Sequence, residues 1–160
     1  MRDRWLELAS VLLAGVACSC GGAAKPTPPF KPIATLEEVM HGLVIPNADA
    51  VWKSVGTIYS AKGVEEIRPR TEDDWVHLEA SATTLMESGN LLMMEGRAKD
   101  NGKWMERCRA LIDAADSVRG AAKAKDPDAL FTRGGDLFEA CQGCHFEYRF
   151  TKDPSVIRTH

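Results

Sequence analysis

The stretch from Asp126 to Tyr148 restricts the fold more than any other part of this 160-residue chain. Asp126 and Pro127 are typical of a helix start, because aspartate caps a first turn and proline's missing N–H costs nothing there. Seven residues then recur at helical spacing, with two cysteines and a histidine among them: Leu130, Gly134, Leu137, Cys141, Cys144, His145 and Tyr148. This spacing predicts a helix that turns three reactive side chains toward a core.

The three reactive side chains form the pattern Cys-x-x-Cys-His, which is the attachment signature of a c-type haem. The thiols of Cys141 and Cys144 can add to the two vinyl groups on one edge of a haem, and the His145 imidazole can then be the proximal iron ligand. We therefore expect one covalently attached haem c per chain.

A Cys-x-x-Cys pair also occurs in redox dithiols and in zinc sites. A thioredoxin-like dithiol lies near a βαβ pattern, which this sequence lacks, and no second Cys/His cluster is present to complete a zinc site. Cys108 lies outside the motif, within an apolar helical stripe. We expect it to be a small buried hydrophobe.

The first helix is predicted by a capping box, in which Thr35 is the N-cap and Glu38 lies three residues further on. Apolar positions keep one helical phase on both sides of Pro46. Since proline cannot donate the i→i−4 hydrogen bond, we expect a single helix that is kinked at Pro46 and continues through Tyr59 until Gly63 ends it.

Two more helices fill the middle of the chain. Thr71 is the predicted N-cap of one that reaches about Gly96 and leaves His77 exposed. The other starts after residues 100–102, and its apolar stripe begins at Trp104. No segment has the alternation of a strand, so no strands are expected. The prediction is an all-α fold, namely an antiparallel four-helix bundle with a covalent haem on its last helix.

The amino terminus predicts export from a bacterial cell. Arg2 and Arg4 precede an apolar run of about ten residues, which is too short for the competing interpretation, a transmembrane anchor. Cys18 and Cys20 follow and resemble the lipid-modified cysteine of bacterial lipoproteins, with cleavage alone as the alternative. We expect residues 1–20 to be the export signal and the mature chain to be periplasmic, either soluble or tethered by lipid.

Composition completes the domain plan. Residues 21–34 are a proline-rich linker, residues 35–150 the helical domain and residues 151–160 a flexible tail. The formal net charge of −3 makes nucleic acid an unfavourable partner.

The place of the motif, near the carboxy terminus on the last of four helices, resembles cytochrome c′ and its class II relatives. Residue-level agreement is confined to the last helix, from Gly134 to Arg149, where an aromatic and a basic residue follow His145 as in that family. The resemblance implies that Arg149 lies on the proximal side of the haem. The alternative is a solvated arginine that interacts with the helix dipole.

The resemblance also implies that the distal residue lies on the first helix. Met40 is central on that helix's apolar face and is the first candidate for the distal iron ligand, while His41 lies at the margin and is the second. A methionine that only fills space beside the haem is the alternative.

The distal residue separates two functions. With Met40 or His41 on the iron, we expect an exported carrier of single electrons between redox partner proteins. With an apolar distal residue, we expect a five-coordinate haem that binds nitric oxide or carbon monoxide. No acid/base pair or nucleophile accompanies the motif, so an enzyme is not expected. A homodimer is left open.

Overall fold

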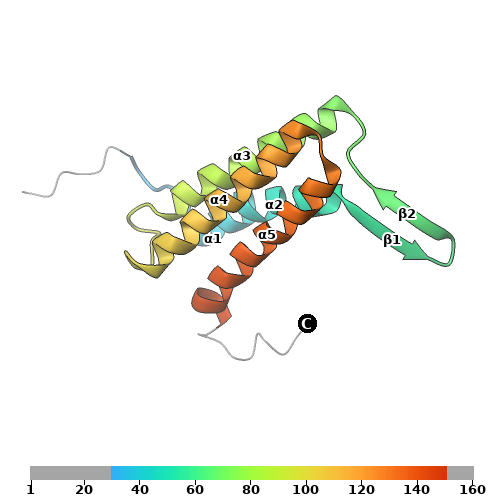
Figure 1. Cartoon of the computed structure of the whole chain (residues 1–160). Helices are drawn as coiled ribbons and strands as arrows, with labels where there is room; N and C mark the ends of the chain where they lie inside the picture. The colour runs from blue at the N-terminus through green and yellow to red at the C-terminus, as the bar shows by residue number, and fades with distance from the viewer. Residues whose placement is uncertain (1–29, 151–160) are drawn as a thin grey trace, which may run out of the picture. The chain divides into compact units, whose positions relative to one another are not determined.

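The computed structural model describes residues 30–150, which are mostly helical with one small two-stranded sheet (Figure 1). The predicted export signal, most of the linker, the tail and both candidate lipidation cysteines, Cys18 and Cys20, lie outside the described residues. Within residues 30–150, no helix has the length and apolar character needed to cross a membrane.

The first helix begins at the predicted capping box. In front of α1 (Leu36–Val39), the Thr35 hydroxyl accepts a hydrogen bond from the Glu38 N–H, and the Glu38 carboxylate accepts one from the Thr35 N–H. These two bonds satisfy backbone donors that the first turn of a helix leaves without partners. This part of the prediction is confirmed.

The helix then changes pitch before the proline. A π-helix, η1 (Met40–Val44), follows α1 and leads directly into α2 (Ile45–Ser54). The Ile45 N–H donates to the Met40 carbonyl five residues back, which widens this turn. Pro46 then falls in the first turn of α2, directly after this wide turn, and has no N–H to donate back to η1. The irregularity expected at Pro46 therefore lies just before it, in the turn that carries both distal candidates.

A β-hairpin replaces the predicted end of this helix. The chain turns extended at Val55, and β1 (Gly56–Ser60) pairs antiparallel with β2 (Gly63–Ile67). The predictions of a helix through Tyr59 and of a fold without strands are therefore wrong. Threonine, isoleucine and tyrosine favour a pleated strand. Ile58 and Tyr59 matched the helical phase by coincidence, because they are 48% and 79% exposed.

The remaining helices start where their caps predict. The Thr71 hydroxyl caps α3 (Glu72–Leu92), which ends four residues before the expected Gly96. The next helix is α4 (Lys103–Ala124).

The last helix carries the attachment motif to its end. The Asp126 carboxylate caps α5 (Pro127–His145) by accepting the N–H groups of Asp128 and Ala129. A π-helix, η2 (Phe146–Phe150), continues α5. The predicted cap and the proline in the first turn are confirmed.

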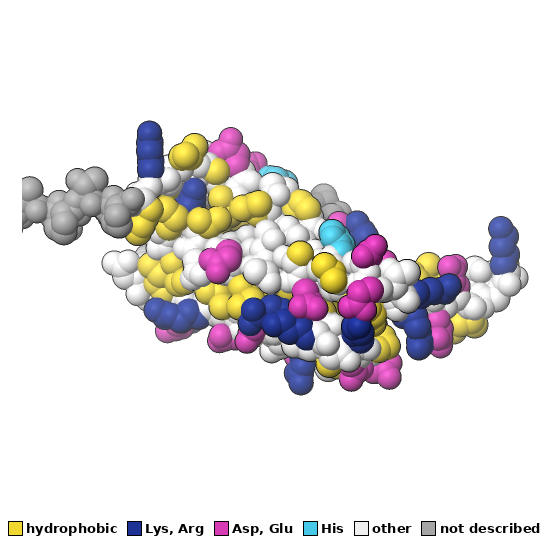
Figure 2. All heavy atoms as spheres, turned by 90° about the horizontal axis from the view of Figure 1, so that it is seen from above, with side chains coloured by type: hydrophobic (Ala, Val, Ile, Leu, Met, Phe, Trp, Pro, Cys, Tyr) yellow, Lys and Arg dark blue, Asp and Glu magenta, His cyan; other side chains and the backbone are white. Residues whose placement is uncertain are grey.

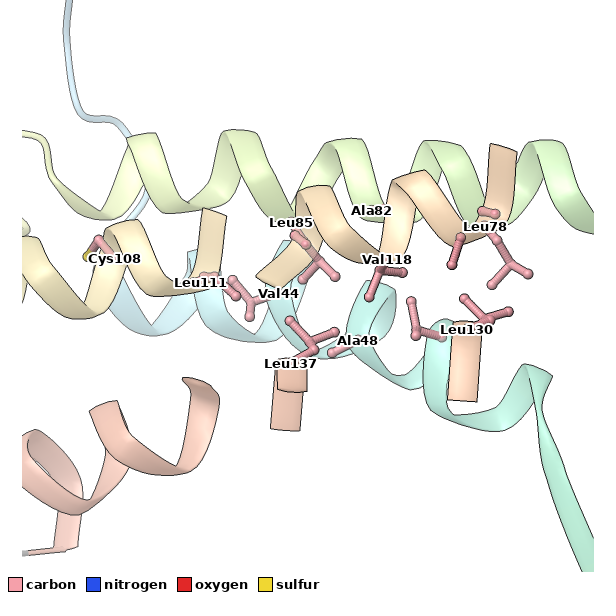
Figure 3. Packing of buried hydrophobic residues seen from close by; sticks show 14 of the residues in the cluster. Val44, Ala48, Leu78, Ala82, Leu85, Cys108, Leu111, Val118, Leu130 and Leu137 are labelled. Atoms are coloured by element: carbon pink, nitrogen blue, oxygen red, sulfur yellow. The ribbon is translucent and has the colours of Figure 1, made fainter. Parts of the chain in front are cut away.

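The four longer helices share one apolar core. α3 packs against α4, α4 against α5, and α2 against both α3 and α5. Figure 3 shows side chains from these helices and from η1 converging, including Leu85, Val118, Leu130 and Leu137. Cys108 is also buried, as expected, and lies at the end of the row away from Leu130 (Figure 3). The hairpin lies outside this core (Figure 1).

The surface carries charges of both signs. On the face drawn in Figure 2, lysine and arginine side chains are interspersed with aspartate and glutamate. Elsewhere in the described residues, charges pair locally, as Arg119 does with Asp116 and Arg133 with Asp136. Such exposed pairs contribute little stability each.

Candidate functional site

The apolar stripe of α5 passes from a filled core into a cavity. Leu130 and Leu137 are 0% exposed, whereas Cys141, Cys144 and His145 on the same stripe are half-buried. These three residues line a cavity of about 820 Å³. A volume of this size lies within the range that proteins use for cofactors and other small molecules.

Five elements supply the walls of this cavity. They are the α1–η1 segment with the first residue of α2, the end of α3 with the loop after it, the first three turns of α4, the end of α5, and η2. The apolar part of the lining includes Leu36, Met40, Val44, Ile45, Leu92, Trp104, Cys108, Leu111 and Ala140. The cationic part is Lys99, Arg107 and Arg149, against the single acid Glu37. The cavity therefore suits a ligand that is largely apolar and carries negative charge.

The two motif thiols are protonated at neutral pH. Burial, with a smaller effect of Cys144, raises the pKa of the Cys141 thiol to about 11. Burial also raises the pKa of Cys144, although the nearby Arg107 guanidinium acts in the opposite direction. Both thiols are free of disulfides. They are therefore in the reduced form that addition to an unsaturated group requires, while burial keeps the reactive thiolate fraction small.

The imidazole of His145 is neutral in this environment. Burial, and then the positive charge of Arg149, lower its pKa below the ordinary value. A neutral imidazole nitrogen is the form that ligates a metal. Arg149 is exposed and lines the same cavity as His145. The structure thus places Arg149 and the motif histidine at the same cavity, while a position on the proximal side of a haem, or a role as a solvated arginine, stays a prediction.

The two distal candidates both line the cavity but differ in exposure. Met40 is half-buried and packs against the apolar core. The side chain of His41 is 69% exposed, and its Nε2 lies 4.0 Å from the Glu37 carboxylate. Of the two residues, Met40 is therefore the better placed to face a group inside the cavity. His77, expected on the outside, is exposed on α3.

A charged cluster beside the motif went unrecognised in the sequence. Arg107 of α4 donates from Nε and Nη2 to the two carboxylate oxygens of Glu147, at 3.1 and 2.9 Å. Lys103 lies 3.4 Å from the same carboxylate. The Arg107 hydrogen bond is the main reason why the pKa of Glu147 is lowered. The sequence did contain a signal for Arg107. It follows Trp104 by three residues and precedes Leu111 by four, which places it on the same face of the helix as these two buried residues.

Tyr148 ties η2 to the start of α4. Its ring packs edge-on against Trp104 with 4.9 Å between ring centroids, and its hydroxyl donates to the Asp100 carboxylate. That bond raises the pKa of Tyr148 to about 12. Asp100 also accepts the N–H groups of Gly102 and Trp104, and so caps α4. Tyr148 is thus a second link, beside the Arg107–Glu147 pair, that fixes η2 to α4 and to the loop before it.

Metal coordination by protein side chains alone is not seen in the described part of the chain. Within residues 30–150, no three His, Cys, Asp or Glu side chains come together in a way that could hold a metal ion. A haem iron needs only axial protein ligands, because the porphyrin supplies four nitrogens. The observation therefore does not bear on the haem prediction.

Comparisons with known proteins leave the family of this chain open. No protein-family model, curated protein or solved structure matches it. The interpretation of the site consequently depends on the Cys-x-x-Cys-His motif and on the cavity into which the fold directs it.

Proposed function

We propose that this chain is an exported c-type cytochrome of the cytochrome c′ type, an antiparallel four-helix bundle that carries single electrons between redox partner proteins. The observation that carries the proposal is that all three motif side chains, Cys141, Cys144 and His145, line one large cavity of mixed apolar and cationic character. A haem is itself a flat apolar ring with two carboxylates at one edge.

The residues present fit a covalent haem. Cys141 and Cys144 would hold the haem as two thioethers, and the half-buried His145 would be its proximal ligand. In each thioether, one C–S and one C–H bond would replace the S–H bond and the vinyl π bond, with no net oxidation or reduction. Lys99, Arg107 and Arg149 supply positive charge for the propionates. When bound, haem supplies one-electron chemistry.

The protein side chains do the rest of the work in this proposal. Leu92, Trp104 and Leu111 form an apolar wall of the cavity, and such a wall strengthens the effect of nearby charges. Met40 is the proposed distal ligand because it is half-buried and lines the cavity, with the exposed His41 as the alternative. No substrate pocket is required, and the proposal does not make the chain an enzyme.

A second candidate function has an observation of its own. Beside Met40, the α1–η1 segment presents Leu36 and Val44, which cannot ligate iron. If Met40 only packs against the haem, the distal side is open, and a five-coordinate haem would bind nitric oxide or carbon monoxide. The structure is compatible with either arrangement.

The proposed cell location and assembly depend on the sequence. Periplasmic export, and a lipid tether at Cys18 or Cys20, remain predictions about residues that the structure does not describe. A homodimer is likewise a prediction. Recovery of the intact chain in the membrane fraction, lost when both cysteines become serine, would support the tether.

The test of the proposal is covalent haem. The chain is expressed with a bacterial cytochrome c maturation system, denatured and extracted with acidified organic solvent. Haem should stay with the polypeptide because thioether bonds survive both treatments. Cys141→Ser with Cys144→Ser should release it, while Cys108→Ser, which changes a thiol outside the motif, should retain it. Release of all haem from the unaltered chain would overturn the proposal.

A further inference from the structure

The Arg107 guanidinium lies directly against the backbone of the attachment motif. A Cβ atom built on Gly143 would stand 2.9 Å from Arg107 Nη1 and 3.3 Å from its Cζ. Contacts under 3.0 Å are essentially never seen for real Cβ atoms, so one of the two groups would have to move. Glycine between the motif cysteines is therefore what permits the guanidinium to occupy this position.

Glu147 holds the guanidinium in that position. The two groups form a bidentate pair, which fixes the plane of the guanidinium as well as its distance. The side chains are 34% and 24% exposed, so water screens the pair only in part. Because Glu147 follows His145 by two residues, the pair joins α4 to the turn just after the motif. The result is a fixed positive charge, with a fixed partner, at the cavity wall.

We propose that Arg107 is a positioning residue that docks the attachment segment on α4 and raises the reduction potential of the haem, with Glu147 as its opposing charge. The inference deepens the proposed function and depends on it. A positive charge near the iron stabilises the reduced form, which carries one positive charge fewer, and a negative charge does the opposite. The two partners therefore have opposite electrostatic effects on one measurable quantity.

The experiment is a mediated spectroelectrochemical titration of the haem-loaded chain at one pH and one ionic strength. Arg107→Gln should shift the one-electron reduction potential to more negative values, and Glu147→Gln should shift it to more positive values. The double variant should lie between the two. A pair with only a structural role would shift both single variants in the same direction, so same-direction shifts, or none, would overturn the inference.

A matched ion pair further along α4 serves as the control. Arg119 and Asp116 pair on the same helix, and residue 119 is about 18 Å from residue 107 along its axis. Arg119→Gln and Asp116→Asn make the same changes of charge. Their shifts should be much smaller than those at Arg107 and Glu147, because the charge lies further from the cavity.

Gly143→Ala tests the contact itself. The added methyl group should displace the guanidinium and shift the potential in the same direction as Arg107→Gln. In the Arg107→Gln background it should add little. If Gly143→Ala shifts the potential equally with and without Arg107→Gln, its effect does not depend on Arg107. That result would contradict the docking contact.

The yield of covalent haem is the second readout, for the case in which a variant does not load. The inference would also be supported if Arg107→Gln and Gly143→Ala lower that yield while Arg119→Gln leaves it unchanged. Full yield with an unshifted potential in both would overturn it. An unaltered chain that attaches no haem would instead reject the proposed function, so the two failures are distinguishable.

Discussion

The two halves of α5 carry one apolar stripe through two different environments. In the first half, Leu130 and Leu137 are completely buried among side chains of the neighbouring helices. In the second half, Cys141, Cys144 and His145 continue the stripe but line a cavity of about 820 Å³. The stripe predicts which residues face inward. Whether they meet neighbouring side chains or an open cavity depends on the helices opposite.

The contrast also separates the kinds of interaction that hold each half. The first half has apolar contacts and one hydrogen bond from the Trp52 indole to the Gly134 carbonyl. The second half is held through η2, which follows it: Glu147 pairs with Arg107 of α4, and Tyr148 packs against Trp104 and donates to Asp100 in the loop before α4. We infer that stability is concentrated in the first half and adaptability to a ligand in the second.

The largest effect on stability is expected from a cavity made in the first half of α5, whose stripe is completely buried. Leu137→Ala removes a fully buried side chain and should lower the free energy of unfolding by about 2–5 kcal/mol. Phe131→Ala removes a larger side chain from the same helix, but one that is 64% exposed, and should change stability by about 0.5 kcal/mol or less. Urea unfolding followed by far-UV circular dichroism measures both. Equal losses would contradict the comparison.

A smaller effect on stability is expected at Gly89, where α3 packs tightly against α4. A Cβ at Gly89 would lie 2.5 Å from Ile112 Cγ1 and 3.1 Å from the Cys108 carbonyl oxygen. Gly89→Ala should therefore destabilise by about 1–2 kcal/mol, as overpacking exceeds the gain in helix propensity.

Gly120 is the matched control for Gly89. It lies within α4, and no atom is within 4 Å of the position that its Cβ would occupy. Gly120→Ala should stabilise by about 0.5–1 kcal/mol, because only helix propensity changes. The two variants should thus shift the midpoint of the same urea curve in opposite directions. A stabilising Gly89→Ala would show that the helices can separate there.

Met40 lines the cavity opposite the second half of α5. Met40→Leu should lower the free energy of unfolding by less than about 1.5 kcal/mol, since it roughly conserves volume. Its main effect is expected in the absorption spectrum. If Met40 ligates the iron, the unaltered protein should be low-spin in both oxidation states and bind carbon monoxide slowly, and Met40→Leu should make it high-spin and open. If His41 is the ligand, His41→Ala should cause that conversion instead. An unaltered protein that is already high-spin and binds carbon monoxide readily would favour the gas-binding function.

The smallest effect on stability is expected at the exposed start of α3, away from both halves of α5. The pKa of Asp74 is lowered, mainly because its carboxylate accepts the N–H groups of Arg70 and Thr71. A carboxyl with a lowered pKa in the folded state stabilises the fold above its ordinary pKa, and this stabilisation is lost as the pH falls through the folded value.

Asp74→Asn tests this linkage. It should destabilise the chain slightly at pH 7, and the difference from the unaltered chain should shrink as the pH falls below 4. Asp73→Asn removes a charge from the same turn and controls for the helix dipole. Urea unfolding at a series of pH values measures the difference. A gap that stays constant into the acid range would rule out the carboxylate as its cause.

Local signals were sufficient for the helix starts. Thr35, Thr71 and Asp126 each cap a helix by hydrogen bonds to residues two or three positions away, and each was predicted. The end of the first helix was not predicted correctly, because the helical spacing of apolar residues continued by coincidence through Ile58 and Tyr59. The β-branched residues Thr57, Ile58 and Val64 were the contrary evidence in the sequence.

The sequence by itself determined the Cys-x-x-Cys-His motif, the helix caps and the inward stripe of α5, because all three depend on residues close together in the chain. Only the tertiary structure decided that the second half of this stripe lines a cavity. It alone also decided that Arg107 reaches Glu147, 40 positions away, across the backbone of Gly143. Such features depend on which residues of separate helices come face to face. Helical periodicity gives the inward face of each helix but not its partner across the core.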